Sequence, residues 1–210
     1  MTPVVTVIVV TDPLCSWCWG MAPAVEQVSD RLADTVRFEL LLGGVNVDST
    51  LPVGDYGRRL LMRIWREVAE TTGQQFGYRI PEGFVYNSVR ACLAVAAVRR
   101  ASGRPPFGYL HRLQQLLFEQ GVDVNDPDVL VGAARDLGFD DDAVRAALDD
   151  AAALDALRAE FAGARNYGTQ ALPNVLTEDT GRRRLLAGGY VDAAMLETLI
   201  RARLTESSGQ

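Results

Sequence analysis

The order of apolar and polar residues predicts that the chain begins with a strand, a helix and a second strand. Residues 4–10 are apolar and mostly β-branched, which is typical of a fully buried strand. Apolar residues then recur at helical spacing over residues 21–32. Over residues 36–42 they alternate with other residues until Gly43-Gly44 ends the run, which predicts a second strand.

A long helical segment follows. Between about residues 56 and 167 the strand pattern disappears, and apolar residues recur three or four positions apart. Glycines predict where several of these helices end, while Asp126-Pro127 and Asp140 are suited to begin helices. Apolar stripes cover residues 60–68, 85–96 and 110–117, followed by predicted helices over 127–138, after 140 and over 151–164.

Extended chain returns only near the end of the sequence. Residues 174–177 and 184–187 are predicted strands, with a hairpin turn at 178–181, a closing helix over 192–204 and a frayed tail at 205–210. Neither β segment is large enough to be stable alone, so we expect one sheet with the helices inserted between its halves. The predicted fold class is α/β, with residues 1–50 and 168–210 as one domain and 51–167 as an inserted helical domain.

The main candidate for chemistry is a Cys-x-x-Cys sequence, Cys15 to Cys18, placed where the first strand gives way to a helix. A thiol at the first turn of a helix faces unpaired backbone N–H groups and the positive end of the helix dipole, which favour the thiolate. We therefore predict that Cys15 is a nucleophile and Cys18 its resolving partner. We expect this turn to be exposed, a position that structural cysteines seldom occupy.

Two other uses of the pair compete with this prediction. A zinc site normally needs four ligands, and only Cys92 and His111 could join the pair, both distant in sequence and without the usual spacing. A buried structural pair is the second alternative. Cys92 lies in an apolar helical stripe and is expected to be a small buried hydrophobe, and His111 is expected on a surface face of its helix.

Composition limits the remaining classes of function. The chain of 210 residues is 48% hydrophobic and carries a net charge of −6, which indicates neither a nucleic-acid partner nor an anionic membrane surface. All 21 basic residues are Arg, so a Schiff-base mechanism is excluded. The first apolar run is too short to span a membrane, and no basic segment or cleavage site marks a signal peptide, so we expect a cytoplasmic protein. No metal or organic cofactor is predicted.

Three motifs together resemble one known family. Pro23 stands five residues after Cys18, Asn87-Ser88 opens a helix of the insertion, and Leu172-Pro173 precedes the third predicted strand. With the Cys-x-x-Cys sequence, this combination is similar to the DsbA-like branch of the thioredoxin-fold superfamily, in particular its FrnE-like and predicted protein-disulfide-isomerase subgroup. The resemblance implies a thioredoxin fold (β-α-β … β-β-α) interrupted by an all-helical domain.

The resemblance also implies roles for particular residues. The Leu172–Pro173 peptide bond is expected to be cis and to lie beside the cysteines, with backbone groups of Leu172 pairing with the substrate chain. Many relatives have a buried acid six residues before the first cysteine that relays protons from the second thiol, but Val9 stands there in this chain. Asp12 either replaces that acid or caps the turn, and the Asp-Pro sequence favours the cap.

These residues together predict a cytoplasmic thiol–disulfide oxidoreductase or isomerase that acts on protein or small-molecule thiols and disulfides, as a monomer or homodimer. Trp17 is expected to be exposed and Trp19 buried, and the predicted substrate-binding residues are Ser16, Trp17, Leu172 and Pro173. Two alternatives come from other classes. One is a non-redox adapter that presents another protein to a protease and needs neither cysteine. The other is an enzyme similar to kappa-class glutathione transferases, which typically have Ser in place of the reactive cysteine.

Overall fold

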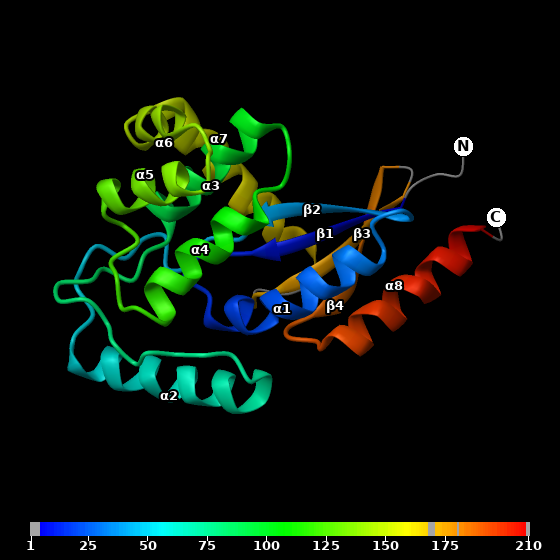
Figure 1. The fold of residues 1–210 in the computed structure, drawn as a ribbon, viewed down its shortest axis with the longest axis horizontal. Coiled ribbons are helices and arrows are strands. Elements are labelled where there is room, and N and C mark those ends of the chain that lie inside the picture. Colours follow the sequence, from blue (N-terminus) through cyan, green and yellow to red (C-terminus); the bar gives the residue numbers. More distant parts are fainter. Residues whose placement is uncertain (1–4, 168–170, 180, 209–210) are drawn as a thin grey trace.

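A four-stranded mixed sheet lies at the centre of one half of the molecule (Figure 1). The computed structural model describes residues 5–167, 171–179 and 181–208. The strands are β1 (Val5–Thr11), β2 (Val36–Leu42), β3 (Asn174–Asp179) and β4 (Arg182–Gly188). Their order is β2-β1-β3-β4, with β1 parallel to β2 and antiparallel to β3, and β3 antiparallel to β4. The two β segments therefore join one sheet, as predicted.

Helices cover both faces of this sheet. On one face, α1 (Ser16–Arg31) and α8 (Ala193–Ser208) pack over apolar side chains of β1 that include Val7 and Val9 (Figure 1). On the other face, Ile8 and Val10 contact Ala164, at the end of α7 (Ala151–Ala164). Since both faces of β1 are covered, its sequence is a continuous apolar run rather than an alternating one.

The remaining helices occupy the chain between β2 and β3; most of them lie together beside the sheet, and the first of them lies apart and packs along α1 (Figure 1). They are α2 (Asp55–Thr72), α3 (Val89–Ser102), α4 (Phe107–Phe118), α5 (Pro127–Asp136) and α6 (Asp141–Leu148), followed by α7 and a short 3-10 turn (Arg165–Tyr167). Their core contains the fully buried Trp65, Tyr109 and Phe118, and the same cluster includes Leu14 and Leu42. The helices thus share a core with the end of the sheet near the cysteines. The proposed division into two domains stays a prediction.

Local sequence explains where several of these helices begin and end. Asp126, Asp140 and Asp150 each accept a hydrogen bond from a backbone N–H in the first turn of α5, α6 and α7, so the predicted caps at Asp126 and Asp140 are confirmed. Helices α2 and α3 end at Gly73 and Gly103, whose φ angles of 76° and 66° lie in the left-handed region that favours glycine.

The structure corrects three predicted boundaries. Helix α3 begins only at Val89, because residues 85–88 form hydrogen bonds with other segments; the Asn87 side chain, for example, donates to the carbonyl of Val47. Strand β3 continues through Asp179, which pairs with Arg182, so residues 178 and 179 are not part of the hairpin turn. Helix α8 continues through residues 205–208, where fraying was predicted; Thr205 there donates its hydroxyl to the helix backbone.

An ion pair fastens the helical segment to the end of β2. Arg99 of α3 donates to the two carboxylate oxygens of Glu160 in α7 at 2.8 and 2.5 Å, and to the carbonyl of Leu40 at 2.9 Å. Glu160 also accepts a hydrogen bond from the N–H of Leu42 at 2.7 Å. Two inserted helices and a strand are joined in this way close to the cysteine-bearing turn.

We expect Glu160→Ala to lower the free energy of unfolding by about 2 to 3 kcal/mol, because it leaves the Arg99 guanidinium and the Leu42 amide without their shared partner. Asp155→Ala is the matched control on the same helix, since Asp155 and Arg158 form an exposed pair at 3.8 Å; its loss should stay below about 0.5 kcal/mol. Urea denaturation measures both. Equal losses of unfolding free energy in the two variants would contradict this role of the Arg99–Glu160 ion pair.

Candidate active site

Cys15 is the N-cap residue of α1. Its Sγ accepts a hydrogen bond from the backbone N–H of Cys18 at 3.2 Å, and its own N–H donates to the carbonyl of Asp12 at 3.2 Å. The sulfur therefore lies where the first-turn N–H groups and the helix dipole stabilise negative charge. This is the position in which the sequence places the nucleophile.

Both sulfurs of the pair are more enclosed than predicted. The exposed fraction is 8% for Cys15 and 4% for Cys18, so the expectation of an exposed turn is wrong. The loop before α3 is one reason, because the Tyr86 hydroxyl donates to the carbonyl of Leu14 and holds the tyrosine against the turn. All three cysteines are free thiols. Burial alone does not separate a reactive pair from a structural one, and the distinction depends on the surroundings of each sulfur.

Cys18 differs from Cys15 in its electrostatic surroundings. Burial raises the pKa of the Cys18 thiol well above its ordinary value, and the hydrogen bond with Cys15 and the charges of Cys15 and Asp12 add to this increase. A hydrogen bond from the Thr11 side chain acts in the opposite direction. Cys18 is therefore a protonated thiol at neutral pH, and any attack by it requires a proton acceptor.

Asp12 is a fully buried carboxyl next to this turn. Its Oδ1 accepts a hydrogen bond from the N–H of Leu14 at 2.8 Å, which confirms the predicted cap. Its Oδ2 accepts from the Ser88 hydroxyl at 2.6 Å and from the Cys92 thiol at 3.4 Å. Burial raises the pKa of Asp12 from 3.8 to about 6, although the hydrogen bonds oppose that increase. Asp12 is thus both a cap and a buried acid, which the sequence presented as alternatives.

Two of these partners were missed as site residues. Cys92 is completely buried in the apolar core, as predicted for a small hydrophobe, but its thiol is also hydrogen-bonded to Asp12, which was not predicted. Ser88 lies one helical turn before it, and the Asn87-Ser88 motif was the one signal in its sequence. Gln114 of α4 was also missed; it is fully buried and donates to the backbone carbonyl of Asp12 at 3.2 Å. All three residues belong to the inserted helical segment, and only the topology brings them to Asp12.

The predicted substrate-binding proline lies at the same end of the sheet. The Leu172–Pro173 peptide bond is cis, as the resemblance implies. Because Asn174 pairs with Val10, Pro173 lies beside the end of β1 that leads into the cysteine turn. The Leu172 side chain packs against Gly43, where a Cβ would lie 2.6 Å from Leu172 Cδ1. Pairing of the Leu172 backbone with a substrate stays a prediction.

The side chains between and after the cysteines form a partly closed surface. Trp19 is buried, as predicted. Trp17 is half-buried rather than exposed, because its ring packs against Tyr190 with the ring centroids 6.1 Å apart. Ser16 is buried in the first turn of α1. The half-buried Trp17 is therefore the side chain of this set with the most surface to offer a substrate.

His111 is predicted on a surface face of its helix, and the structure leaves it partly exposed there, in a hollow that Trp19 and Arg112 also line. It is half-buried beside Phe107, and burial lowers the pKa of its imidazole to about 4. Within residues 5–167, 171–179 and 181–208, no group of three or more His, Cys, Asp or Glu side chains could hold a metal ion.

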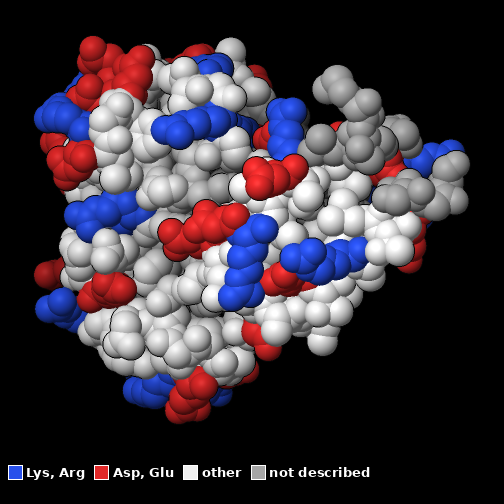
Figure 2. Space-filling view, turned by 45° about the vertical axis from the view of Figure 1, so that its right-hand side comes forward, with Lys and Arg blue, Asp and Glu red and all other residues white. Residues whose placement is uncertain are grey.

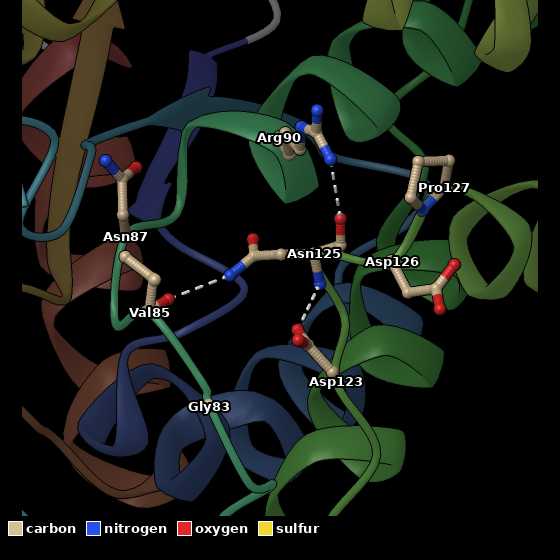
Figure 3. Close-up of a pocket in the computed structure, with 8 residues that line it drawn as sticks. All are labelled: Gly83, Val85, Asn87, Arg90, Asp123, Asn125, Asp126 and Pro127. Carbon is tan, nitrogen blue, oxygen red and sulfur yellow. Dashed lines mark hydrogen bonds between the residues drawn. The ribbon is translucent and has the colours of Figure 1, made fainter. Parts of the chain in front are cut away.

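A separate hollow of about 500 Å³ opens on the helical segment (Figure 3). Its lining includes Arg90, Asp123 and Asn125, and the Asn125 amide donates to the carbonyl of Val85 at 3.0 Å. Neither cysteine of the pair is part of this lining. Acidic and basic side chains are interspersed on the face of the molecule shown in Figure 2. Among the described residues, every helix is too short or too polar to be a membrane-spanning segment.

The buried carboxyl predicts a specific pH dependence of stability. Since the pKa of Asp12 is raised from 3.8 to about 6, folding favours its protonated form, and this stabilisation is lost as the pH rises from about 4 past 6. We expect Asp12→Asn to gain up to about 3 kcal/mol of stability relative to the wild type across this range, at about 1.4 kcal/mol per pKa unit. Denaturant unfolding of the reduced proteins between pH 4 and pH 8, at roughly half-unit steps, measures the difference. A constant difference would contradict the assignment.

Comparison with known proteins places this site in a family context. The DSBA-like thioredoxin domain matches residues 6–201 of the chain. A curated relative, the ClpXP adapter protein SpxH of Halalkalibacterium halodurans, is 24% identical over 167 residues, which is 77% of this chain and 55% of that protein. The chain spans about half the length of the curated relatives that it matches.

Solved structures agree over nearly the whole chain. A candidate protein disulfide isomerase from Nitrosomonas europaea is 26% identical, with a TM-score of 0.88 and coverage of 96% of this chain and 98% of that one. The cytosolic disulfide reductase DsbM from Pseudomonas aeruginosa is 28% identical, with a TM-score of 0.76 and coverage of 94% and 99%. The fold is therefore the thioredoxin fold of DsbA-type proteins, and the chain belongs to the family of DSBA-like thioredoxin domain proteins.

Proposed function

We propose that this protein is a thiol–disulfide oxidoreductase in which Cys15 is the nucleophile and Cys18 the resolving thiol. The observation that carries the proposal is the contrast between the two sulfurs. Cys15 Sγ caps α1 and accepts the N–H of Cys18, whereas burial keeps Cys18 protonated. Cys15 Sγ lies at the N-terminus of a helix, the position expected of the attacking sulfur, and Cys18 holds its proton until a later step, which is the division of labour that disulfide exchange needs.

The proposed reaction has two steps. The Cys15 thiolate attacks one sulfur of a substrate disulfide, forming a mixed disulfide and releasing the other substrate sulfur as a thiolate, which takes a proton. Cys18 then loses its proton and attacks Cys15, giving the Cys15–Cys18 disulfide and a second reduced substrate thiol. The substrate gains two electrons and the protein dithiol loses two. The reverse sequence oxidises a dithiol, and isomerase activity would use the same first step.

Asp12 is the proposed proton acceptor for the second step. Its charge acts on the Cys18 thiol, and a carboxyl with a pKa of about 6 is mostly ionised at neutral pH yet basic enough to take up a proton. The Thr11 hydroxyl, which hydrogen-bonds Cys18, would steady the sulfur as its proton leaves. Asp12 then takes the role that a buried acid at the position of Val9 would have.

The likeness to DsbM supports the reductive direction and a cytoplasmic location. That relative is a cytosolic disulfide reductase, and one structure of it contains glutathione (GSH). We therefore propose glutathione or a protein thiol as the partner, bound across Ser16, Trp17, Leu172 and Pro173 at one end of the sheet. Whether the protein works as a monomer or a homodimer stays a prediction.

Cys18→Ser should trap the mixed disulfide. When the reduced variant reacts with oxidised glutathione, we expect one glutathione per chain, attached to Cys15, because no resolving thiol remains. The wild type should pass through the same adduct to the Cys15–Cys18 disulfide, and Cys15→Ser should form neither product. Intact mass and peptide mapping after an acid quench measure this. An adduct mainly on Cys92, or equal reaction of Cys15→Ser, would overturn the assignment.

A second candidate function is the adapter role, which the likeness to SpxH favours. An adapter needs the surface of the protein but not its thiols. The double variant Cys15→Ser/Cys18→Ser separates the two functions: it should be inactive in disulfide exchange, whereas an adapter would still accelerate ClpXP degradation of a bound client protein. The alternative similar to kappa-class glutathione transferases typically has Ser where Cys15 stands, and it stays a prediction.

A further inference from the structure

We propose that Ser88 and Cys92, two residues of the inserted helical segment, are positioning residues of the thiol site. Their donors hold the Asp12 carboxylate in its charged form and so set the pH above which Cys18 can resolve a mixed disulfide. The inference rests on the proposed function. It gives the inserted helices a part in the chemistry and assigns a role to the third cysteine.

The hydrogen bonds among Asp12, Ser88 and Cys92 support the first part of this inference, that the two donors hold the carboxylate. Ser88 Oγ donates to Asp12 Oδ2 at 2.6 Å, and Cys92 Sγ lies 3.4 Å from the same oxygen and 3.7 Å from Ser88 Oγ. Oδ1 is occupied separately by the N–H of Leu14. All three side chains are fully buried, so water does not replace these donors at little cost. The side-chain donors to Oδ2 therefore come from α3 and the residue just before it, and the backbone of Val45 adds a further hydrogen bond to the carboxyl.

The charges around Asp12 support the second part, that its ionisation determines the pH at which Cys18 can act. The titratable groups on which the Asp12 charge acts are Cys18 of α1, Cys92 of α3 and Tyr86 of the preceding loop, and Cys15 in turn acts on Cys18 and Tyr86. Burial raises the pKa values of Cys18, Cys92 and Tyr86 well above their ordinary ranges, so all three are neutral near pH 7. Cys92 is thus a protonated donor and not a competing anion.

Two further charged residues lie near Cys92 but do not contact Asp12. Glu160 of α7 raises the pKa of Cys92, and Arg99 neutralises that glutamate through the ion pair described above. Among the residues that the structure describes, Asp12 itself forms no ion pair. Burial opposes the Asp12 charge, while the hydrogen bonds from Ser88, Cys92 and the backbone favour it. The balance at Asp12 is therefore set by burial on one side and hydrogen bonding on the other, and not by a nearby cation.

The consequence concerns the second step only. When Cys18 attacks the mixed disulfide, its proton passes to the Asp12 carboxylate and is later released to solvent, so the step requires charged Asp12. Removing a donor makes the carboxylate less stable relative to the acid, and a higher pH is then needed to ionise it. Attack by Cys15 on the substrate does not require this proton transfer, so the first step should change little.

The test compares Cys92→Ala, which deletes the donor, with Cys92→Ser, which keeps a hydroxyl at that place. Each reduced protein is mixed with oxidised glutathione over a range of pH and quenched with acid. Mass spectrometry then follows formation and decay of the Cys15–glutathione adduct. We expect the decay rate of the wild type to rise with a midpoint near pH 6. The Cys92→Ala midpoint should move up by about one pH unit, the size of one hydrogen bond to a charged group. Cys92→Ser should restore it.

Further variants make the outcome decisive. Ser88→Ala removes the other donor and should move the midpoint in the same direction, so the result does not depend on a single variant folding. Asp12→Asn should remove the midpoint near pH 6 altogether. An unchanged midpoint in both donor variants, or a rate lowered equally at every pH, would overturn the inference while leaving the proposed function intact. If the wild type forms no adduct at Cys15, the proposed function fails, and the inference fails with it.

Discussion

A carboxyl group without access to solvent lies between the first strand and the cysteine-bearing helix, and much of the surrounding structure satisfies its hydrogen bonds. The N–H of Leu14 donates to one carboxylate oxygen of Asp12, and the side chains of Ser88 and Cys92 donate to the other. The Gln114 amide donates to the backbone carbonyl of Asp12. Burying such a group without partners would be costly, so these contacts hold the turn in one conformation. The N–H of Cys15 is bonded to the same backbone carbonyl, so the contacts that hold Asp12 also hold the start of the cysteine-bearing helix.

This arrangement makes the helical segment part of the site rather than an attachment to the sheet. Helices α3 and α4 supply the side chains that reach Asp12, and Arg99 and Glu160 fasten α3 and α7 to the end of β2. Apolar packing supports the same junction, because Leu14 and Leu42 belong to the cluster that fills the helical segment. The thioredoxin-type part of the fold provides the two thiols at the start of α1, and the inserted helical segment provides much of the electrostatic environment in which the proposed exchange would take place.

Much of the fold could be predicted because its signals are local. The β-branched run before Cys15, the alternation from Val36 onward and the caps at Asp126 and Asp140 each depend on residues close in sequence. The cysteine pair and the cis Leu172–Pro173 bond came from motifs. Burial of the turn could not be predicted, because it depends on Tyr86, whose contact with Leu14 spans 72 residues.

The same reason explains the residues that were missed. Cys92 stands in an apolar stripe, and nothing near it in sequence indicates that a carboxyl 80 residues earlier will lie against its thiol. Trp17 was expected to be exposed because Tyr190, its packing partner, lies on the far side of the inserted helices in sequence. Such long-range contacts decide which polar side chains act together, and they follow only once the sheet order and the helix packing are known.

The most direct test of this account is the titration of the Asp12 carboxyl itself. In the reduced protein, a carbon-13 NMR titration of the side-chain carboxyl carbons, with Asp12→Asn to assign the signal, should show Asp12 ionising with a midpoint of about 6. A midpoint near 3.8, the ordinary value for an aspartate, would mean that the carboxyl is not held in the buried environment described here. The link between the inserted helices and the thiols would then be contradicted.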